Sequence, residues 1–302
     1  MTLGYDKQLY LLAFDHRASF SKNLLGIGGE PTRAELERIA ETKLVIYEAF
    51  ELAVVEGVES QTAGLLVDEL YGSAVARRAR SAGRLLAMPV EKSGQDEFDF
   101  EYGEDFGRHI EEFDPTFAKV LVRYNPEGDG ALNKRQAMRL RRLSDWLHER
   151  DRKFLFELLV PAEQHQLAAV GGATERYDAE LRPSLVIQTM RELQADGVEP
   201  DIWKIEGFEH RDDCIQAAAQ ARMGGRDGVV CIVLGRGADA AKVLHWLRLG
   251  AGVPGYAGFA VGRTIWWDAL VRYLAGESDA DLAAAEIARN YRTLIDAYTG
   301  EA

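Results

Sequence analysis

A repeated alternation of short apolar runs with longer helical stretches is the feature that most constrains the fold. Eight runs have the length and composition of buried strands, at 9–14, 64–69, 85–90, 118–124, 153–159, 201–206, 228–234 and 257–262. Helix signals mark the stretches 31–56, 73–83, 133–151, 182–197, 212–225 and 238–251. The runs are apolar nearly throughout, which indicates burial on both faces, as in parallel strands joined by crossover helices.

Eight strand–helix units predict an α/β chain folded as a single (β/α)8 TIM barrel. A doubly wound open sheet is the alternative architecture. The chain has 302 residues, 47% of them hydrophobic, which is enough for one such barrel. Because no linker or composition shift marks a second domain, we predict one domain over residues 1–302. The longest irregular connections are predicted at 94–106 and 162–181, both following predicted strands.

Charge and composition exclude several classes of partner. The formal net charge of -13 argues against broad contact with nucleic acid or an anionic membrane. Cys214 and Cys231 lack the spacing of a metal site, and a scaffold held by disulfides would need more cysteine pairs, so we expect neither a metal site nor a structural disulfide at these residues. The sequence shows no signal segment and no apolar run of roughly 18 residues, so we predict a soluble cytoplasmic protein. A homo-oligomer is compatible with the sequence.

Charged residues lie within or directly after nearly every predicted strand. The carboxyl ends of barrel strands and the loops after them form the active site in this architecture. The residues at these positions are Asp15, His16, Arg17, Asp68, Glu69, Glu91, Lys92, Lys119, Arg123, Glu157, Lys204, Glu206, Arg236 and Arg263. One such residue would mean little, but convergence from separate strands predicts a charged site.

Lys204 lies in the middle of the sixth run, where a strand usually has an apolar residue. Burial or a second cation lowers the pKa of a lysine toward neutrality, and the resulting amine attacks ketones to form an iminium. Lys119, in the fourth run, is the candidate second cation, or it holds a substrate hydroxyl. The alternative is that Lys204 only forms a buried ion pair with Glu157 or Glu206.

Two carboxylates are candidates for proton transfer and orientation. Glu157 has apolar neighbours in the fifth run, so we predict a raised pKa, as a general acid or base needs. Its alternative role is to neutralise a lysine. Asp15 ends the first run, where it either acts in the site or caps the following turn.

Glycine and arginine occur together after the last two runs, in LGRGAD (234–239) and VGRT (261–264). Barrels often hold phosphate at this place with glycine N–H groups and a helix N-terminus. The candidate residues are Gly235, Arg236, Gly262 and Arg263. Tight turns with exposed arginines are the alternative, because Gly-x-Gly alone is a weak signal.

The ordered segments LLAFDHRASF, LLVDELYG, MPVEKSG, AKVLVRYNPEGD, FLFELLVPA, DIWKIEG and GFAVGRTIWWDAL resemble the class I tagatose-bisphosphate aldolase family. The similarity covers about residues 9–275. Within that family, the chain is most similar to the aldolase-like domain fused to 5-dehydro-2-deoxygluconokinase in myo-inositol catabolism. No kinase domain is present in this sequence.

The resemblance implies a barrel aldolase that uses a lysine Schiff base without metal or cofactor. Lys204 matches the Schiff-base lysine, Lys119 the fourth-strand lysine, Glu157 the catalytic glutamate and Asp15 the first-strand aspartate. The substrate- and phosphate-binding residues are then expected to be His16, Arg17, Glu91, Arg123, Gly235, Arg236, Gly262 and Arg263. The chain departs from the family at His16-Arg17-Ala18, which replaces Gln-Arg-Gly, and at Gly235-Arg236-Gly237, which replaces a serine-containing turn.

The implied reaction is retro-aldol cleavage of a phosphorylated keto sugar or keto-sugar acid. For the inositol branch, 2-deoxy-5-keto-gluconate 6-phosphate would give dihydroxyacetone phosphate and malonate semialdehyde. One alternative is an aldolase for another ketose phosphate, of the tagatose-bisphosphate or sulfosugar-phosphate type. Another is a non-catalytic sugar-phosphate-binding partner of a separate kinase. A metal-dependent aldolase is disfavoured because the six histidines show no metal-ligand spacing.

Overall fold

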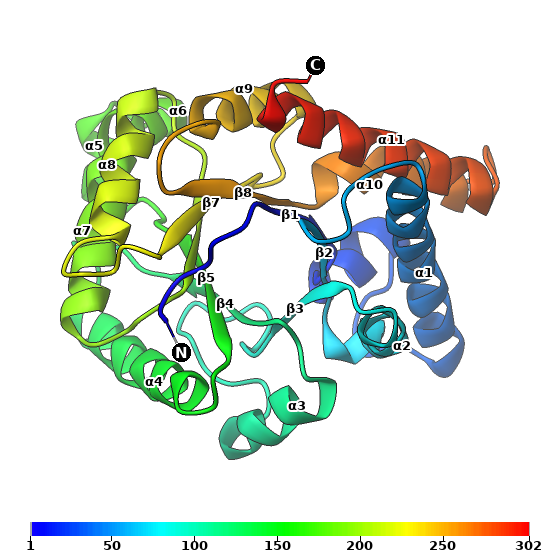
Figure 1. Ribbon diagram of the computed structural model, residues 1–302, viewed down its shortest axis with the longest axis horizontal. Coiled ribbons are helices and arrows are strands. Elements are labelled where there is room, and N and C mark those ends of the chain that lie inside the picture. The colour runs from blue at the N-terminus through cyan, green and yellow to red at the C-terminus, as the bar shows by residue number, and fades with distance from the viewer. Residues whose placement is uncertain (1, 302) are drawn as a thin grey trace.

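Eight parallel strands form a closed barrel in chain order in the computed structural model, which describes residues 2–301 (Figure 1). The strands are β1 (Leu9–Ala13), β2 (Ala63–Leu66), β3 (Leu85–Pro89), β4 (Phe117–Arg123), β5 (Lys153–Leu159), β6 (Ile202–Glu206), β7 (Val230–Leu234) and β8 (Tyr256–Val261). Strand β1 pairs with both β2 and β8, which closes the ring. The prediction of a (β/α)8 barrel is confirmed.

Helices surround the barrel on its outer face (Figure 1). They are α1 (Arg33–Val55), α2 (Glu69–Ser81), α3 (Phe106–Phe113), α4 (Gly130–His148), α5 (Gln164–Ala169), α6 (Thr174–Arg176), α7 (Arg182–Ala195), α8 (Arg211–Ala221), α9 (Ala240–Gly250), α10 (Arg263–Leu274) and α11 (Ala280–Thr299). Short η segments occur at Phe20–Leu24, Gly103–Asp105 and Tyr177–Leu181. The prediction of an irregular segment at 162–181 was wrong, because α5, α6 and Tyr177–Leu181 lie within it.

Helix starts follow ordinary capping chemistry. Thr32 caps α1 and forms a reciprocal capping box with Glu35. Asp68 caps α2 by accepting a hydrogen bond from the N–H of Tyr71 at 2.8 Å. Helix α2 therefore begins before the predicted residue 73, and Asp68 belongs to the helix start rather than to a strand.

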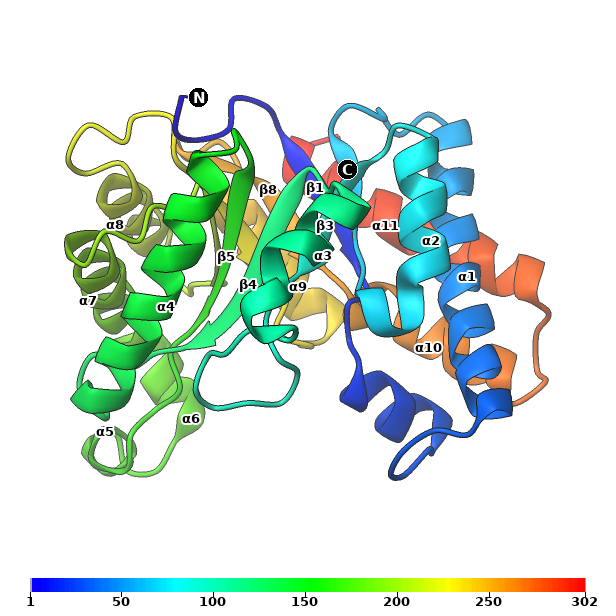
Figure 2. The same ribbon diagram turned by 90° about the horizontal axis from the view of Figure 1, so that it is seen from below.

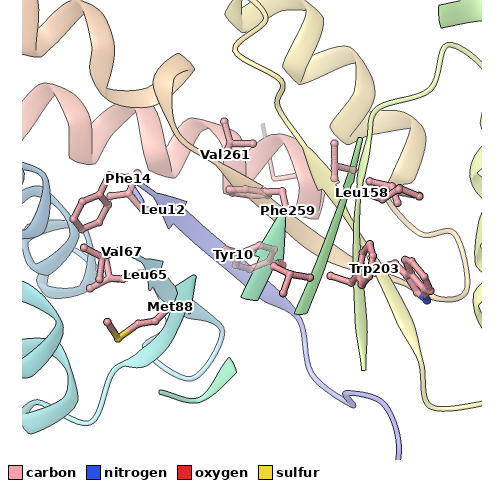
Figure 3. Packing of buried hydrophobic residues seen from close by; sticks show 14 of the residues in the cluster. Tyr10, Leu12, Phe14, Leu65, Val67, Met88, Leu158, Trp203, Phe259 and Val261 are labelled. Atoms are coloured by element: carbon pink, nitrogen blue, oxygen red, sulfur yellow. The ribbon is translucent and has the colours of Figure 1, made fainter. Parts of the chain in front are cut away.

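Strand side chains alternate between the barrel interior and the helix layer. Leu9, Leu11 and Ala13 of β1 belong to the interior cluster, together with Phe117, Leu155 and Ile202. Tyr10, Leu12 and Phe14 belong to the larger cluster between strands and helices, part of which Figure 3 shows. Burial on both faces explains why the strand sequences are apolar nearly throughout.

The two ends of the barrel differ. In Figure 2 the N-terminus lies at the upper edge, whereas the arrowhead of β4 and helices α5 and α6 lie toward the lower edge. The carboxyl ends of the strands thus open on the side that carries the longer loops, as expected for an active-site face. Of the helices in residues 2–301, none has both the length and the apolar character needed to cross a membrane.

Candidate active site

One cavity of about 380 Å³ lies at the carboxyl ends of the strands. All the candidate site residues predicted from the sequence line it, namely Asp15, His16, Arg17, Glu91, Lys119, Arg123, Glu157, Lys204, Gly235, Arg236, Gly262 and Arg263. The barrel therefore brings together residues that are up to 248 positions apart, from Asp15 to Arg263.

Three inward-facing strand positions form the charged floor of the cavity. Phe117, Leu155 and Ile202 fill the interior below them, and the residues two positions further along β4, β5 and β6 are Lys119, Glu157 and Lys204. Because side chains alternate with a period of two, these residues point to the same interior. Glu157 and Lys204 are also direct partners in the β5–β6 register. The packed apolar layer excludes water from below the charged one.

Lys119 is surrounded by carboxylates. Its Nζ lies 2.8 Å from Asp15 Oδ2, 2.9 Å from Glu91 Oε1 and 3.0 Å from Glu157 Oε2, and the residue is 1% exposed. Burial alone would lower the pKa of Lys119, but Asp15, Glu157 and Glu91 together raise it well above its usual range. Lys119 is therefore a fixed ammonium group that can donate hydrogen bonds but cannot act as a nucleophile.

Glu157 bridges the two lysines, with Oε1 at 3.0 Å from Lys204 Nζ and Oε2 at 3.0 Å from Lys119 Nζ. Burial favours the neutral acid, yet the charges of Lys119 and Lys204 hold the pKa of Glu157 below its ordinary value. The prediction of a raised pKa was wrong, because it considered only the apolar neighbours along the chain. Glu157 is an anion that accepts protons from its partners or from a bound molecule.

Asp15 is likewise held as an anion. Burial raises its pKa, but the charges of Lys119 and Lys204 outweigh that effect and lower it. Its contact with Lys119 shows that Asp15 faces the cavity, so the alternative of a purely local turn cap does not describe its side chain.

Glu91 differs from the other two carboxylates. Burial raises its pKa, and Lys119 and Arg17 offset this only in part. Arg17 donates to the backbone oxygen of Glu91 at 2.8 Å and lies 3.2 Å from its Oε1 and 3.0 Å from Glu101 Oε2. The Glu91 Oε2 atom is buried and lacks a hydrogen-bond partner among the described residues. Arg17 is thus largely neutralised by its own neighbours.

At the opposite wall, Arg236 follows β7 and is already paired. Its Nε lies 2.9 Å from Glu206 Oε1 and its Nη1 lies 2.7 Å from Asp178 Oδ2. Arg263, the first residue of α10, donates weakly to the backbone oxygen of Arg236 at 3.4 Å. Within residues 2–301, Arg263 has no carboxylate partner, so its charge is the one on this wall that remains available for an anion.

Two glycines shape this wall, one because of its backbone conformation and the other because of close packing. Gly237 has φ +69°, and a Cβ there would lie 2.0 Å from Nη2 of Arg263. A Cβ on Gly262 would lie 2.2 Å from the backbone oxygen of Ala13. The two turns therefore place Arg263 and the N-terminus of the 12-residue helix α10 against the cavity.

His16 and Arg123 complete the lining. The His16 ring packs edge-on against Trp266 at 5.5 Å between ring centroids. Burial, supported by the nearby cations, lowers the pKa of His16 to about 4, so the ring is neutral at physiological pH. Arg123 donates to the backbone oxygen of Gln95 at 3.0 Å, which links β4 to the loop at 94–106.

Three of the charged residues singled out in the sequence do not line the cavity. Asp68 pairs with Lys43, Glu69 contacts His109 at 2.8 Å, and Glu206 holds Arg236. Lys43 and Asp178 were not predicted at all. Lys43 interrupts the apolar face of α1 between Ile39 and Ile46, and that spacing is a signal that sequence reasoning could have used.

The described part of the chain contains no group of three or more His, Cys, Asp or Glu side chains arranged to hold a metal ion. Cys214 and Cys231 are both buried and free. The arrangement can therefore hold an anion near Arg263 and present Lys204 and Lys119 to a carbonyl or hydroxyl group between the walls.

Sequence comparison relates the chain to two aldolases of Enterococcus faecalis. It is 24% identical over 301 residues to tagatose 1,6-diphosphate aldolase 1, covering 91% of this chain and 85% of that protein. It is 26% identical over 207 residues to tagatose 1,6-diphosphate aldolase 2, covering 65% of this chain and 55% of that protein.

Solved structures share the fold at lower identity. A Schiff base-forming fructose-1,6-bisphosphate aldolase has a TM-score of 0.55 and 15% identity, with 96% of this chain and 93% of that one covered. An archaeal fructose 1,6-bisphosphate aldolase has a TM-score of 0.58 and 14% identity, with 97% and 94% covered. The protein Cgl0159 of Corynebacterium glutamicum has a TM-score of 0.59 and 17% identity, with 97% and 88% covered.

A family model matches almost the entire chain, over residues 4–301, and its description is "uncharacterized protein conserved in bacteria" (DUF2090). The matched residues include all eight strands of the barrel and the residues that line its charged cavity, and the protein belongs to the DUF2090 family.

Proposed function

We propose that this protein is a Schiff base-forming aldolase that cleaves a phosphorylated keto sugar or keto-sugar acid. The observation that carries the proposal is the Lys204–Glu157–Lys119 array on the floor of the cavity, with both contacts at 3.0 Å. Similarity to the tagatose 1,6-diphosphate aldolases and the shared fold of the fructose-bisphosphate aldolases support the same reaction class.

In this mechanism Glu157 takes a proton from the Lys204 ammonium group, and the resulting amine attacks the ketone carbon of the substrate to form a carbinolamine, whose hydroxyl group then receives that proton. Loss of water gives the iminium, which acts as an electron sink. A carboxylate takes the proton from the hydroxyl group beyond the bond to be cleaved, and the electrons of that C–C bond move to the iminium nitrogen. The aldehyde leaves, the enamine carbon is protonated, and water releases the second product from Lys204.

The other residues have distinct tasks in the proposal. Glu157 is the proton acceptor and donor beside Lys204, whereas the Lys119 ammonium group, which three carboxylates surround, supplies positive charge next to the substrate oxygens. Asp15 orients a hydroxyl group. Arg263, with Gly235 and Gly262, binds the phosphate group, and Arg236 supports this wall through Asp178 and Glu206.

We propose 2-deoxy-5-keto-gluconate 6-phosphate as the first substrate to test, with dihydroxyacetone phosphate and malonate semialdehyde as products. This substrate has an anion at each end. Arg123 and Lys92 line the cavity without a carboxylate partner in residues 2–301, so they suit the carboxylate end when Arg263 binds the phosphate. Tagatose 1,6-bisphosphate and a sulfosugar phosphate are the comparison substrates.

Borohydride trapping tests the covalent step. The protein is reduced in the presence of dihydroxyacetone phosphate, digested and examined by peptide mass spectrometry. We expect an adduct on the peptide that contains Lys204 and none in the Lys204→Met variant, whereas Lys119→Met should still form the adduct at a lower rate. A folded wild-type protein without an adduct would refute the proposal. If the ligand raises the melting temperature in that case, the chain is instead a sugar-phosphate-binding partner.

A further inference from the structure

We infer that Lys43 positions Asp15 for the proposed aldolase reaction, an inference that rests on the proposed function. Lys43 lies on α1, is 0% exposed and does not line the cavity. Its Nζ donates to the backbone oxygen of Phe14 at 2.8 Å and to that of His16 at 3.0 Å. These carbonyl groups stand on either side of Asp15 in the chain.

The two hydrogen bonds fix the backbone at the point where β1 has ended. Strand β1 itself ends at Ala13, but the N–H of Phe14 still donates to the backbone oxygen of Leu66, the last residue of β2, at 2.8 Å. Beyond that point Lys43 holds the carbonyl groups of Phe14 and His16. With the peptide groups on both sides fixed, the Asp15 side chain is directed at Lys119, 2.8 Å away. Lys43 thus acts on the site through Asp15.

The third partner of Lys43 explains how its charge can be buried. Lys43 forms an ion pair with Asp68, which is also fully buried. The other carboxylate oxygen of Asp68 accepts the N–H of Tyr71 at the start of α2. Burial lowers the pKa of Lys43, and Asp68 opposes that shift. The pair therefore joins α1, α2 and the end of β1, because two donors of the ammonium group serve the chain after β1 and the third serves the cap of α2.

A simple structural ion pair would not need this geometry. Asp68 alone would satisfy the charge of Lys43, yet two of the three contacts go to the carbonyl groups that flank Asp15. Hydrogen bonds from charged donors are stronger than neutral ones, so Lys43 is a firm anchor for the start of the long connection between β1 and α1. Removing it should disturb the orientation of Asp15 more than the stability of the barrel.

The test compares Lys43→Met/Asp68→Asn with Asp68→Asn alone. The double variant removes both buried charges, so neither is left unpaired, whereas the single variant keeps the bonds from Lys43 to the carbonyl groups. We expect the double variant to form the borohydride adduct on Lys204 with dihydroxyacetone phosphate. Its kcat should fall at least tenfold below that of Asp68→Asn, with KM changed less than threefold.

A double-mutant cycle separates positioning from general destabilisation. Adding Asp15→Asn should lower kcat strongly in the wild-type background but by less than threefold in the Lys43→Met/Asp68→Asn background. Gln194→Leu is the matched control, because it removes a buried side chain that bonds to Gln220 and Ala221 away from the cavity. It should lower the melting temperature without changing kcat.

Equal kcat values for the single and double variants, or an undiminished effect of Asp15→Asn, would overturn the inference. If the double variant does not fold, Lys43→Gln with Asp68→Asn gives the same comparison with an intermediate loss. If wild-type protein forms no adduct, the proposed function fails separately. A crystal structure of the double variant tests the positioning directly. We expect the distance between Asp15 Oδ2 and Lys119 Nζ to exceed about 3.5 Å, which is beyond hydrogen-bond reach.

Discussion

Replacing Glu157 with glutamine removes the carboxylate that contacts both Lys119 and Lys204. At 3.0 Å and an effective dielectric constant of about 20, each contact has a Coulomb energy of about 5.5 kcal/mol. Desolvation offsets most of this, so the net loss in the free energy of unfolding should be about 3–5 kcal/mol. For a chain of 302 residues, that corresponds to a fall of about 5–8 °C in melting temperature.

The same change should slow the reaction. Loss of a general acid or base typically costs about 10²–10⁴-fold in rate, so we expect kcat to fall within that range while KM changes little. Thermal unfolding followed by circular dichroism and a coupled assay for the aldehyde product measure the two effects.

Glu91→Gln is the matched comparison, because it removes a carboxylate from Lys119 but leaves the Lys204–Glu157 contact. Both variants should lose stability, whereas slower adduct formation on Lys204 should be confined to Glu157→Gln. A Glu157→Gln protein that keeps kcat within threefold of wild type would refute the role in proton transfer. A melting temperature within about 1 °C of wild type, the effect of less than 1 kcal/mol for this length, would refute the energetic argument.

Three further predictions concern the phosphate wall, the pH dependence of stability and barrel closure. Arg263→Ala should raise KM for a phosphorylated ketose about 10–100-fold, the effect of losing a charged hydrogen bond. Arg236→Ala should raise KM less, because Asp178 and Glu206 already neutralise the charge of Arg236. Steady-state kinetics that show the reverse order would assign the phosphate to Arg236. The pKa of His16 is lowered from 6.5 to about 4, so below pH 6.5 the unfolded chain binds the extra proton and stability falls as the pH drops toward 4. Urea unfolding should show that the free energy of unfolding falls by about 3 kcal/mol over this pH range. In His16→Gln this fall should be absent, and a His16→Gln protein with the same pH dependence as wild type would contradict the prediction. Gly258→Ala should destabilise the barrel by about 3 kcal/mol, because its φ is +145° and a Cβ would lie 2.0 Å from the backbone oxygen of Leu9 on β1; an unchanged urea midpoint would contradict this.

The barrel could be predicted because strands buried on both faces have a distinctive composition. The run at 153–159 coincides with β5, and the other strands differ from the predicted runs by a few residues at their ends. Helix α2 starts earlier than predicted, since Asp68 looks like a strand residue in sequence but acts as a helix cap. Segment 162–181 contains short helices of polar composition, with Gly171 and Gly172 between α5 and α6, and in sequence this combination resembles a loop.

The composition of the cavity could also be predicted, whereas its electrostatics could not. Charged residues at strand ends identify most of the lining, because all strands deliver their carboxyl ends to one face, although Asp68, Glu69 and Glu206 lie outside the cavity. The pKa of Glu157 depends on which lysines lie across the barrel, and neighbours in sequence do not contain that information. The pairing of Arg236 with Asp178 joins loops 58 residues apart, so it follows only from the closed ring.

The pair formed by Lys204 and Glu157 has a consequence for how the cavity responds to covalent chemistry. An ammonium group and an iminium group each bear a single positive charge, so a substrate joined to Lys204 would face Glu157 with the same charge as the resting cation. Glu157 has little room to move, because its other oxygen is bound to Lys119. The barrel could therefore hold the covalent intermediate without rearranging its buried charges, and substrate attachment would leave the net charge of the floor constant.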